Sequence, residues 1–549
     1  MDTQNASRSL LGMLLLGLLS LLLVPSASAQ TLDDMVRYSE RLPAPGGPAL
    51  GRGGGGLFAG TASPGALFGN PAGLGWMSSS MITGDLAINR AREENQFRLP
   101  GSPTSSDRTV NDYRLGRLAG AYTFPTQQGS FVIAGSFHQS NTYDRGFNVQ
   151  GTNQANSITG TFLPTSNGFE VDGEDLIFDR SRARIAYESG AIDFSDAVFQ
   201  EGGYPFFQAA NPASSATDGQ LVLEQQDDVL ETGQMNEVSV GAAVAVAPRV
   251  MVGGGLNIVF GEYTFERFFR ETDASGLQPP ANPDNPQTPY DPYFLAGTNL
   301  EGFDEFQLEE RIRTDLSGVN LRFGLSARLL DGLRGGFHVE TPTWLTLTET
   351  FGTQMRTFFD CDFSSGGCVR PDAPLSSGSL TDNEFEYRIN TPPRLGVGLQ
   401  YAQGGLMLAG GIEVVDWTQA EFDTDNGNSD SFIRELNREL ESLDETVNTR
   451  VGAQYTFDAL TLRAGLMYQP DPLDESFQDL DSNSTDGDQL FLSAGLGYAL
   501  SDRATLNVNW AQERFDDQFR SYSSLSGPSP TVRESVTRNR VLIGLTYQY

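Results

Sequence analysis

The end of the chain is the feature that most restricts its fold. The last nine residues, VLIGLTYQY, alternate between two faces up to the final aromatic residue. Read in steps of two, Val541, Ile543, Leu545, Tyr547 and Tyr549 share one face of a strand. A soluble domain seldom ends in this way, whereas a membrane barrel needs a last strand that pairs with its first and faces lipid along one side. An ordinary edge strand is the alternative.

The start of the chain has the pattern of an export signal. Arg8 precedes an apolar run over residues 10–24, and a small-residue cleavage site ends at Ala29. We therefore expect residues 1–29 to be removed. The run is shorter than the ~20 apolar residues that a membrane-spanning helix needs, and no later stretch approaches that length. A membrane-embedded mature chain is expected to cross the bilayer with strands.

The composition agrees with strands that face lipid on one side and a polar lumen on the other. The 549 residues include 61 Gly, 35 Phe and 17 Tyr, yet only 38% are hydrophobic. Alternating membrane strands average to such a value. The net charge is −34, from 70 acidic and 36 basic residues, and every basic residue is Arg. A surface of this sign argues against nucleic acid as a partner.

Period-two patterning recurs in fourteen segments, which predicts an all-β fold, a 14-stranded antiparallel transmembrane β-barrel. Short links follow the even-numbered segments and long links follow the odd-numbered ones. This matches tight periplasmic turns and long extracellular loops, and an even count returns both termini to the periplasmic side. The predicted segments are 80–91, 113–125, 129–145, 234–248, 250–270, 307–330, 333–358, 384–402, 406–423, 445–457, 459–473, 486–500, 503–520 and 533–549.

The segment before the first predicted strand, residues 30–79, contains GRGGGGLFAGTASPGALFGNPAGLGW. Glycine permits the irregular backbone that a crowded lumen requires, so this segment is expected to fill the barrel as a hatch. A disordered linker is the alternative, but Leu57, Phe58, Leu67 and Phe68 need burial. The expected organisation is a signal peptide at 1–29, an N-terminal hatch at 30–79 and a transmembrane barrel with long extracellular loops at 80–549.

The hatch also carries the motif Asn70-Pro71-Ala72, and later stretches read LRGGFHVETPTWLTLTETF, VVDWTQAEF and TLRAGLMYQPDPLDES. In this order and spacing they resemble the FadL/TodX family of outer-membrane transporters for hydrophobic compounds. In that family a short hatch with an Asn-Pro-Ala motif fills a fourteen-stranded barrel. Asn70 is expected to hydrogen-bond the wall or the adjacent hatch backbone, and Pro71 to fix the chain direction. Residues 146–233 have no counterpart in the resemblance.

The resemblance implies passive uptake of hydrophobic small molecules, long-chain fatty acids or hydrocarbons, with lateral release through a gap in the barrel wall. In the family the gap accompanies an inward kink of the third strand, and Gly135 in SFVIAGSFHQS is the candidate for that kink. A lumen-side glycine without this role is the alternative. Leu57, Phe58, Leu67 and Phe68 are the candidate ligand-facing residues; the alternative is that they only wedge the hatch into the wall.

Two cysteines lie close together in FFDCDFSSGGCVR, inside a polar loop. Because export leads into an oxidising compartment, Cys361 and Cys368 are expected to form a local disulfide. A metal pair is the alternative, but the chain has only two histidines and the cysteines lack further ligands nearby. No metal and no cofactor is therefore expected.

An enzyme is not expected, because the chain has no G-x-S-x-G and no H-E-x-x-H motif, and no catalytic residue is proposed. The expected partners are a hydrophobic small-molecule ligand, outer-membrane lipid and the barrel assembly machinery, which would read the C-terminal strand. The protein is expected to be a monomer of the bacterial outer membrane. The alternative function is an accessory barrel of a type IX-like protein secretion system.

Overall fold

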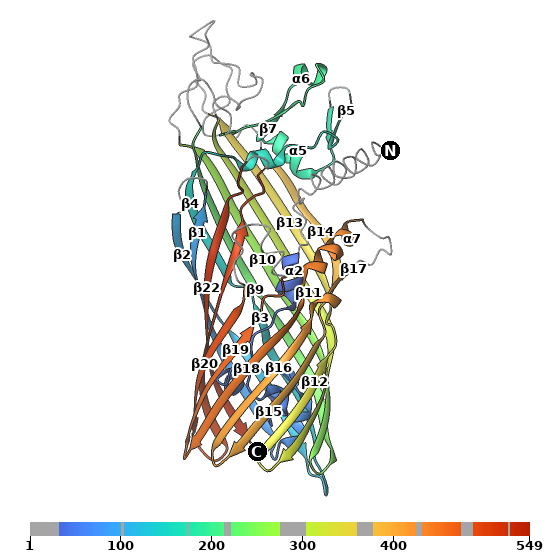
Figure 1. Ribbon diagram of the computed structural model, residues 1–549, viewed down its shortest axis with the longest axis vertical. Helices are drawn as coiled ribbons and strands as arrows, with labels where there is room; N and C mark the ends of the chain where they lie inside the picture. The colour runs from blue at the N-terminus through green and yellow to red at the C-terminus, as the bar shows by residue number, and fades with distance from the viewer. Residues whose placement is uncertain are drawn as a thin grey trace, which may run out of the picture.

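Backbone pairing runs around the whole molecule and closes on itself. In the computed structural model, β1 (Met81–Arg98) pairs along its entire length with β22 (Thr531–Gln548), so the first and last strands of one antiparallel sheet are neighbours. Figure 1 shows the resulting tall barrel, with the C-terminus at the end where the links between strands are short. Closure leaves no free sheet edge between β1 and β22, which matters because lipid offers backbone groups no hydrogen bonds.

The structure describes residues 32–99, 104–172, 175–212, 221–274, 303–359, 377–423, 431–473, 487–524 and 527–549. The expected signal peptide at 1–29 and the expected disulfide between Cys361 and Cys368 lie outside these residues. None of the helices in the described ranges combines the length and the apolar character that crossing a membrane requires.

The predicted fourteen-stranded antiparallel barrel is confirmed, although several wall strands consist of two consecutive pieces. The wall strand made of β12 and β13 is interrupted at Pro342, and the next one is interrupted at Pro392 and Pro393. Proline has no N–H to donate to a ladder, so pairing stops there. The split wall strands are β3 (Phe131–Thr142) with β4 (Arg145–Asn153), β12 (Leu333–Glu340) with β13 (Trp344–Phe359), β14 (Ser377–Asn390) with β15 (Arg394–Gln403), and β16 (Leu406–Asp416) with β17 (Glu421–Asp423).

The remaining wall strands are continuous, and most follow the predicted segments closely. They are β2 (Thr104–Phe124), β9 (Leu223–Ala247), β10 (Val250–Asp273), β11 (Phe303–Leu330), β18 (Glu445–Phe457), β19 (Leu460–Gln469), β20 (Gln489–Ala499) and β21 (Ala504–Arg520).

Large differences from the predicted boundaries occur at the upper ends of several strands, among them β1, β2 and β9. β1 continues to Arg98, β2 begins at Thr104, and β9 begins at Leu223. In these parts both faces carry polar residues, because the wall rises beyond the bilayer. Hydrophobic alternation is therefore absent there, so the predicted strands are shorter than the observed ones.

The outward face of the wall defines an apolar band. On β1 the outward residues Ile82, Leu86 and Ile88 are 50%, 62% and 36% exposed, and the next two outward positions are Arg90 and Arg92. Inward positions of the same strand are buried, and most of them are polar, such as Thr83, Asp85 and Asn89. This change from apolar to charged outward residues marks the outer edge of the lipid-facing surface.

The long connection between β4 and β9 forms a small folded unit above the barrel, drawn in green at the top of Figure 1. Its apolar core, which includes Ile185, Ile192 and Phe206, continues onto Phe269 and Phe306 of the upper wall. The unit comprises η3 (Ile158–Phe162), β5 (Phe169–Asp172), β6 (Asp175–Phe178), α5 (Ser181–Glu188), β7 (Ile192–Phe194), α6 (Asp196–Gln200) and β8 (Phe206–Gln208).

We predict that Leu399→Arg, in the apolar band of β15, lowers the free energy of unfolding by ~2–4 kcal/mol, because an arginine there must be transferred into lipid. Leu399 is 55% exposed on the outward face. The measurement is denaturant unfolding in phospholipid vesicles. Glu94→Arg serves as the control, because this outward side chain is 68% exposed above the band; its effect should stay within about 0.5 kcal/mol. Equal losses in both variants would contradict the position of the band.

Candidate functional site

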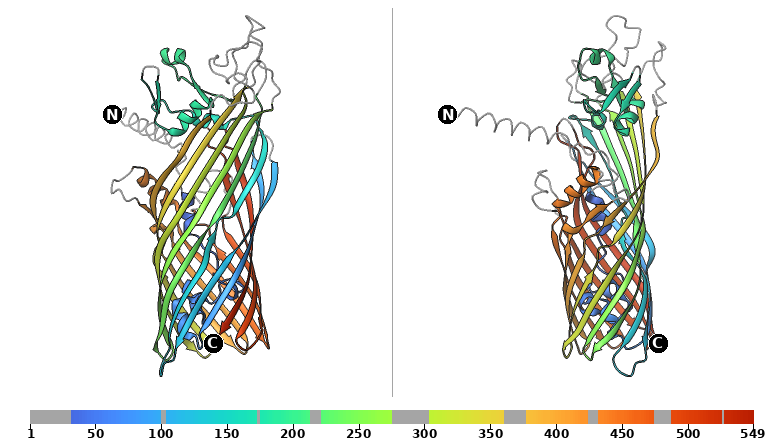
Figure 2. Two further views of the ribbon diagram at one scale, coloured as in Figure 1. Left: turned by 180° about the vertical axis from the view of Figure 1, so that it is seen from behind. Right: turned by 90° about the vertical axis from the view of Figure 1, so that its right-hand side faces the viewer.

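The N-terminal segment lies inside the barrel, where both views of Figure 2 show it in blue. Nearly all of residues 42–76 are buried. The segment follows an irregular path of short helical turns because glycine recurs along it and allows abrupt changes of direction. Its elements are α2 (Leu32–Ser39), α3 (Gly47–Leu50), α4 (Leu57–Gly60), η1 (Pro64–Phe68) and η2 (Pro71–Trp76).

Asn70 fastens this hatch to the barrel. Its Nδ2 donates to the carbonyl oxygen of Phe58 in the hatch at 2.7 Å, and to those of Leu325 at 2.9 Å and Phe337 at 3.2 Å in the wall. Its Oδ1 accepts from the backbone N–H of Ala72 at 3.1 Å, which caps η2. This fully buried amide thus bonds to two wall strands and to two turns of the hatch. The wall and the adjacent hatch backbone are the two kinds of partner expected for Asn70.

The backbone around Asn70 is shaped to let hatch and wall approach closely. Pro71 occupies the first turn of η2, where its missing N–H costs nothing. A Cβ at Gly324 would overlap the Asn70 side chain, and one at Gly336 would overlap the carbonyl of Phe58. Only glycine fits at these two wall positions, so the wall sequence is matched to the hatch that it holds.

Two of the four candidate ligand-facing residues border a small polar cavity between hatch and wall. Phe58 stacks on His338 with ring centroids 4.6 Å apart, and Phe68 meets His138 edge to face at 5.2 Å. Both phenylalanines line this cavity together with charged wall residues such as Arg450. They therefore contact aromatic and charged groups of the wall, which is consistent with the wedging alternative.

The other two candidates, Leu57 and Leu67, are each 1% exposed. Leu57 packs with Phe58 and Phe68 in the core of the hatch, and Leu67 packs against Ala134 and other small wall residues. Neither leucine borders the cavities described in this section.

Buried ion pairs hold the hatch from the wall side. Arg322 is completely buried; its Nη1 and Nη2 bond Glu237 at 2.5 and 2.7 Å, and its Nε bonds Glu340 at 2.7 Å. Nη1 also donates to the carbonyl of Leu67 in the hatch at 3.0 Å. From the hatch, Arg41 reaches the same Glu340 at 2.6 Å. Because every nitrogen of Arg322 is bonded, this arginine has no free edge for a ligand.

The hydrogen-bonded wall is interrupted where the third wall strand, made of β3 and β4, stops pairing with β2. β2 and β3 pair from Phe124↔Phe131 to Arg117↔His138, and there the ladder ends. Above this point β4 pairs with β9 alone, and residues 104–116 of β2 pair with β1 alone. The split begins beside the outward residue Leu115, which is 45% exposed in the apolar band, and continues upward beyond it.

Above the split, the third strand bends into the lumen. Phe147 of β4 is 2% exposed and packs with Phe97 of β1 and Val532 of β22, on the far side of β2. Polar side chains bridge the split: Arg114 of β2 bonds Asp144 at 3.1 Å. Side chains therefore close this interruption, whereas the same third strand is joined to β9 on its other side by backbone hydrogen bonds.

Gly135 does not lie at this bend. It pairs regularly with Gly120 on one side and Val240 on the other. It shares the outward face with Ile133, which is 43% exposed, and a Cβ built on it would meet almost nothing. The irregularity comes later, as a register shift at Ser140 and a break between β3 and β4. The turn-forming run NTYDRG was the sequence signal for this position.

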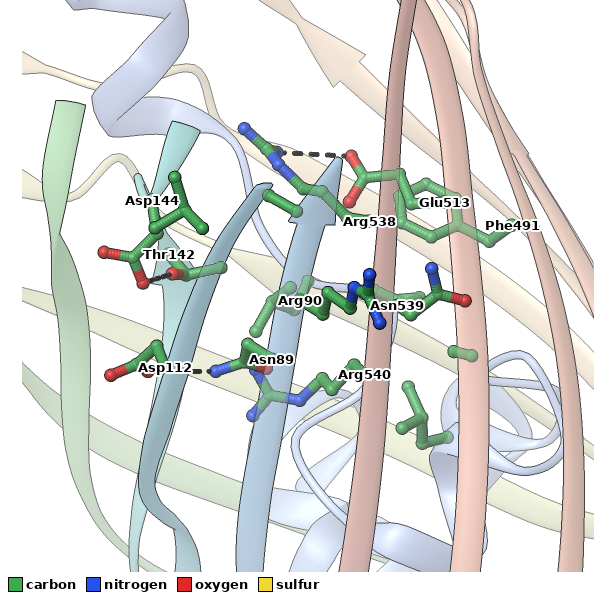
Figure 3. A pocket seen from close by; sticks show the side chains of 16 residues that line it. Asn89, Arg90, Asp112, Thr142, Asp144, Phe491, Glu513, Arg538, Asn539 and Arg540 are labelled. Atoms are coloured by element: carbon green, nitrogen blue, oxygen red, sulfur yellow. Dashed lines mark hydrogen bonds and ion pairs between the residues drawn. The ribbon is translucent and has the colours of Figure 1, made fainter. Parts of the chain in front are cut away.

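A pocket lies beside the bend, behind β1 and β22 (Figure 3). It has about 480 Å³ of empty space, including space open to the surroundings. Its apolar lining comes from the hatch and from the neighbouring wall strands β1, β2, β20 and β21, and its polar lining includes the two residues of the bend, Thr142 and Asp144. The apolar residues are Leu42, Pro43, Leu50, Ala91, Val110, Phe491 and Ala511.

The hatch residues of this pocket, Leu42, Pro43 and Leu50, were not among the candidates. They lie in a stretch without periodicity, so no pattern in the sequence singled them out. Which hatch side chains face the pocket depends on how the glycine-rich segment turns inside the barrel.

We predict that Asn70→Ala loosens the hatch, because it leaves a turn uncapped and buried carbonyls unbonded, at a cost of about 1–3 kcal/mol. Faster hydrogen exchange over residues 57–76 and larger single-channel conductance should follow. Ser63→Ala is the matched control, since Ser63 also precedes a hatch turn but makes no capping bond with its side chain. The anchoring role is wrong if both variants exchange like the wild type.

Sequence comparisons cover the C-terminal part of the chain. Residues 386–549 match the family of outer membrane protein transport proteins, OMPP1/FadL/TodX. Alkane uptake protein A of Marinobacter nauticus is 28% identical over 139 residues, which make up 25% of this chain and 29% of that protein. The chain thus spans less than a third of the length of this relative.

Structural comparisons cover nearly the whole chain. A FadL homologue of Pseudomonas aeruginosa matches 92% of this chain and 99% of its own, with a TM-score of 0.51 and 14% identity. The toluene transporter TodX of Pseudomonas putida matches 91% and 97%, with a TM-score of 0.44 and 12% identity. At 14% identity the first match is evidence for the fold alone. In its family match at residues 386–549 and its fourteen-stranded barrel, the chain is similar to FadL/TodX-type proteins of the bacterial outer membrane.

Proposed function

We propose that this barrel takes up hydrophobic small molecules, long-chain fatty acids or hydrocarbons, and releases them sideways through its wall. The observation that carries the proposal is the split between β2 and the third strand, which begins inside the apolar band and has an apolar-lined pocket beside it. The family description and the name of the relative from Marinobacter nauticus favour a hydrophobic cargo.

Lateral release suits the physics of such a cargo. The hatch fills the lower lumen and is fastened by Asn70 and by ion pairs, so a straight path to the periplasm is blocked by buried side chains. A path from the pocket past Thr142 and Asp144 leads instead to the apolar band. Transfer of a hydrocarbon chain into lipid is favourable by ~0.8 kcal/mol per CH₂. The cargo then reaches lipid without crossing the aqueous periplasm.

The bridge between Arg114 and Asp144 offers a direct test. The substitutions Arg114→Cys and Asp144→Cys are made in a Cys361→Ser/Cys368→Ser background. The two introduced cysteines are then crosslinked with a bifunctional thiol reagent, and dithiothreitol can cleave this reagent. We expect the crosslink to reduce uptake of radiolabelled hexadecane and dodecanoate by cells to background, because it ties the two sides of the split together. Dithiothreitol should restore uptake.

The control is a cysteine pair across the unbroken wall. Leu462 and Leu496 are directly opposed on β19 and β20 and both face outward. Crosslinking Leu462→Cys to Leu496→Cys in the same background should leave uptake unchanged. Undiminished uptake through a barrel crosslinked at positions 114 and 144 would refute release through this split.

A further inference from the structure

The one buried arginine that lines the pocket has no ion pair with a described residue. Arg540 projects inward from β22 and is 6% exposed, and it borders the pocket beside the bend. Its Nη1 donates to the side-chain oxygen of Gln139 at 2.9 Å and to that of Asn89 at 3.3 Å. Its Nε and Nη2 have no hydrogen-bond partner among the described residues. Burying a guanidinium with two unbonded donors is costly unless something else supplies acceptors.

The two unbonded nitrogens form one edge of the guanidinium. The N–H bonds of Nε and Nη2 point the same way and are spaced to match the two oxygens of a carboxylate, as in the common bidentate pair of arginine with an acid. The two amide oxygens on Nη1 hold the opposite side of the group. Gln139 and Asn89 therefore fix the plane of the guanidinium while leaving its carboxylate-binding edge free.

The nearest acidic residues do not supply this carboxylate, because each is paired elsewhere. Asp85 bonds Arg117 at 2.7 Å, and Asp112 bonds Arg114 at 2.6 Å. No described carboxylate lies within ion-pairing distance of Arg540, in contrast to the saturated Arg322 of the hatch anchor. At the other end of the pocket in Figure 3, Arg538 has its own partner, Glu513, at 3.5 Å.

We propose that Arg540 is the head-group anchor of the pocket and gives it a preference for amphiphiles that end in a carboxylate. This inference rests on the proposed function and narrows it. The carboxylate takes the free Nε and Nη2 edge, and the hydrocarbon chain lies along the apolar lining contributed by Leu42, Leu50 and Phe491. A neutral hydrocarbon fits the same lining but leaves the buried cation unpaired, so it binds less tightly.

The test is equilibrium binding of radiolabelled dodecanoate and dodecan-1-ol to the purified full-length protein at pH 8, in a neutral detergent and a carboxylate-free buffer. The wild type should bind dodecanoate more tightly than the alcohol. Arg540→Gln should weaken dodecanoate binding roughly tenfold to a hundredfold, the value of a charge-assisted bidentate pair, and leave dodecan-1-ol within about twofold. Arg540→Lys keeps the charge but loses the planar edge, so its affinity should fall in between.

Arg538→Gln is the matched control. It removes a cation from the same face of the same strand and the same pocket, but one that already has an acidic partner, so the preference for dodecanoate should persist. Unfolding curves of all variants report whether the barrel is intact. If intact Arg540→Gln binds both probes as the wild type does, or if Arg538→Gln loses the preference equally, the anchor assignment is overturned while uptake of hydrophobic molecules stands. A wild type that binds neither probe overturns both.

Discussion

Backbone hydrogen bonding inside the bilayer is the constraint on which the rest of this structure depends. Lipid cannot solvate an N–H or a carbonyl, so the sheet must close, and it does so along the full length of β1 and β22. The split between β2 and the third strand is a departure from this rule within the apolar band. There the third strand keeps its bonds to β9 and bends inward, and side chains such as Arg114 cover the edge that β2 leaves unpaired.

The position of the hatch depends on a second constraint, the need to bond polar and charged groups that are buried. In a polar lumen filled by a glycine-rich segment, a buried amide or ion without a hydrogen-bond partner is costly. Asn70 and Arg322 avoid this cost, because all their side-chain polar atoms are bonded, and both bond the hatch and the wall at once. Their saturation explains why the hatch is stable where it lies. The contrast is with Arg540, which lines a pocket and has two unbonded guanidinium nitrogens, whereas all three guanidinium nitrogens of Arg322 are bonded.

Much of the barrel was predictable because the membrane imposes a simple pattern. Alternation located fourteen wall strands, and apolar outward residues such as Leu399 and Leu496 are exposed as that pattern requires. The prediction failed at the tops of β1, β2 and β9, where water surrounds the wall and no alternation is needed. It also misplaced the bend: Gly135 suggested a kink, but a glycine on the outward face of a regularly paired strand is no cause for one.

The sequence by itself determined the membrane class, the strand count and the hatch motif, because these follow from local periodicity and from short runs such as Asn70-Pro71-Ala72. Only the tertiary structure decided which side chains meet inside the barrel. Leu42, Asp144 and Arg540 lie far apart in the chain and carry no shared pattern. They converge because closure of the sheet brings its first and last strands together and the third strand bends in behind them. A site built from long-range contacts of this kind leaves no periodic trace in the residues that form it.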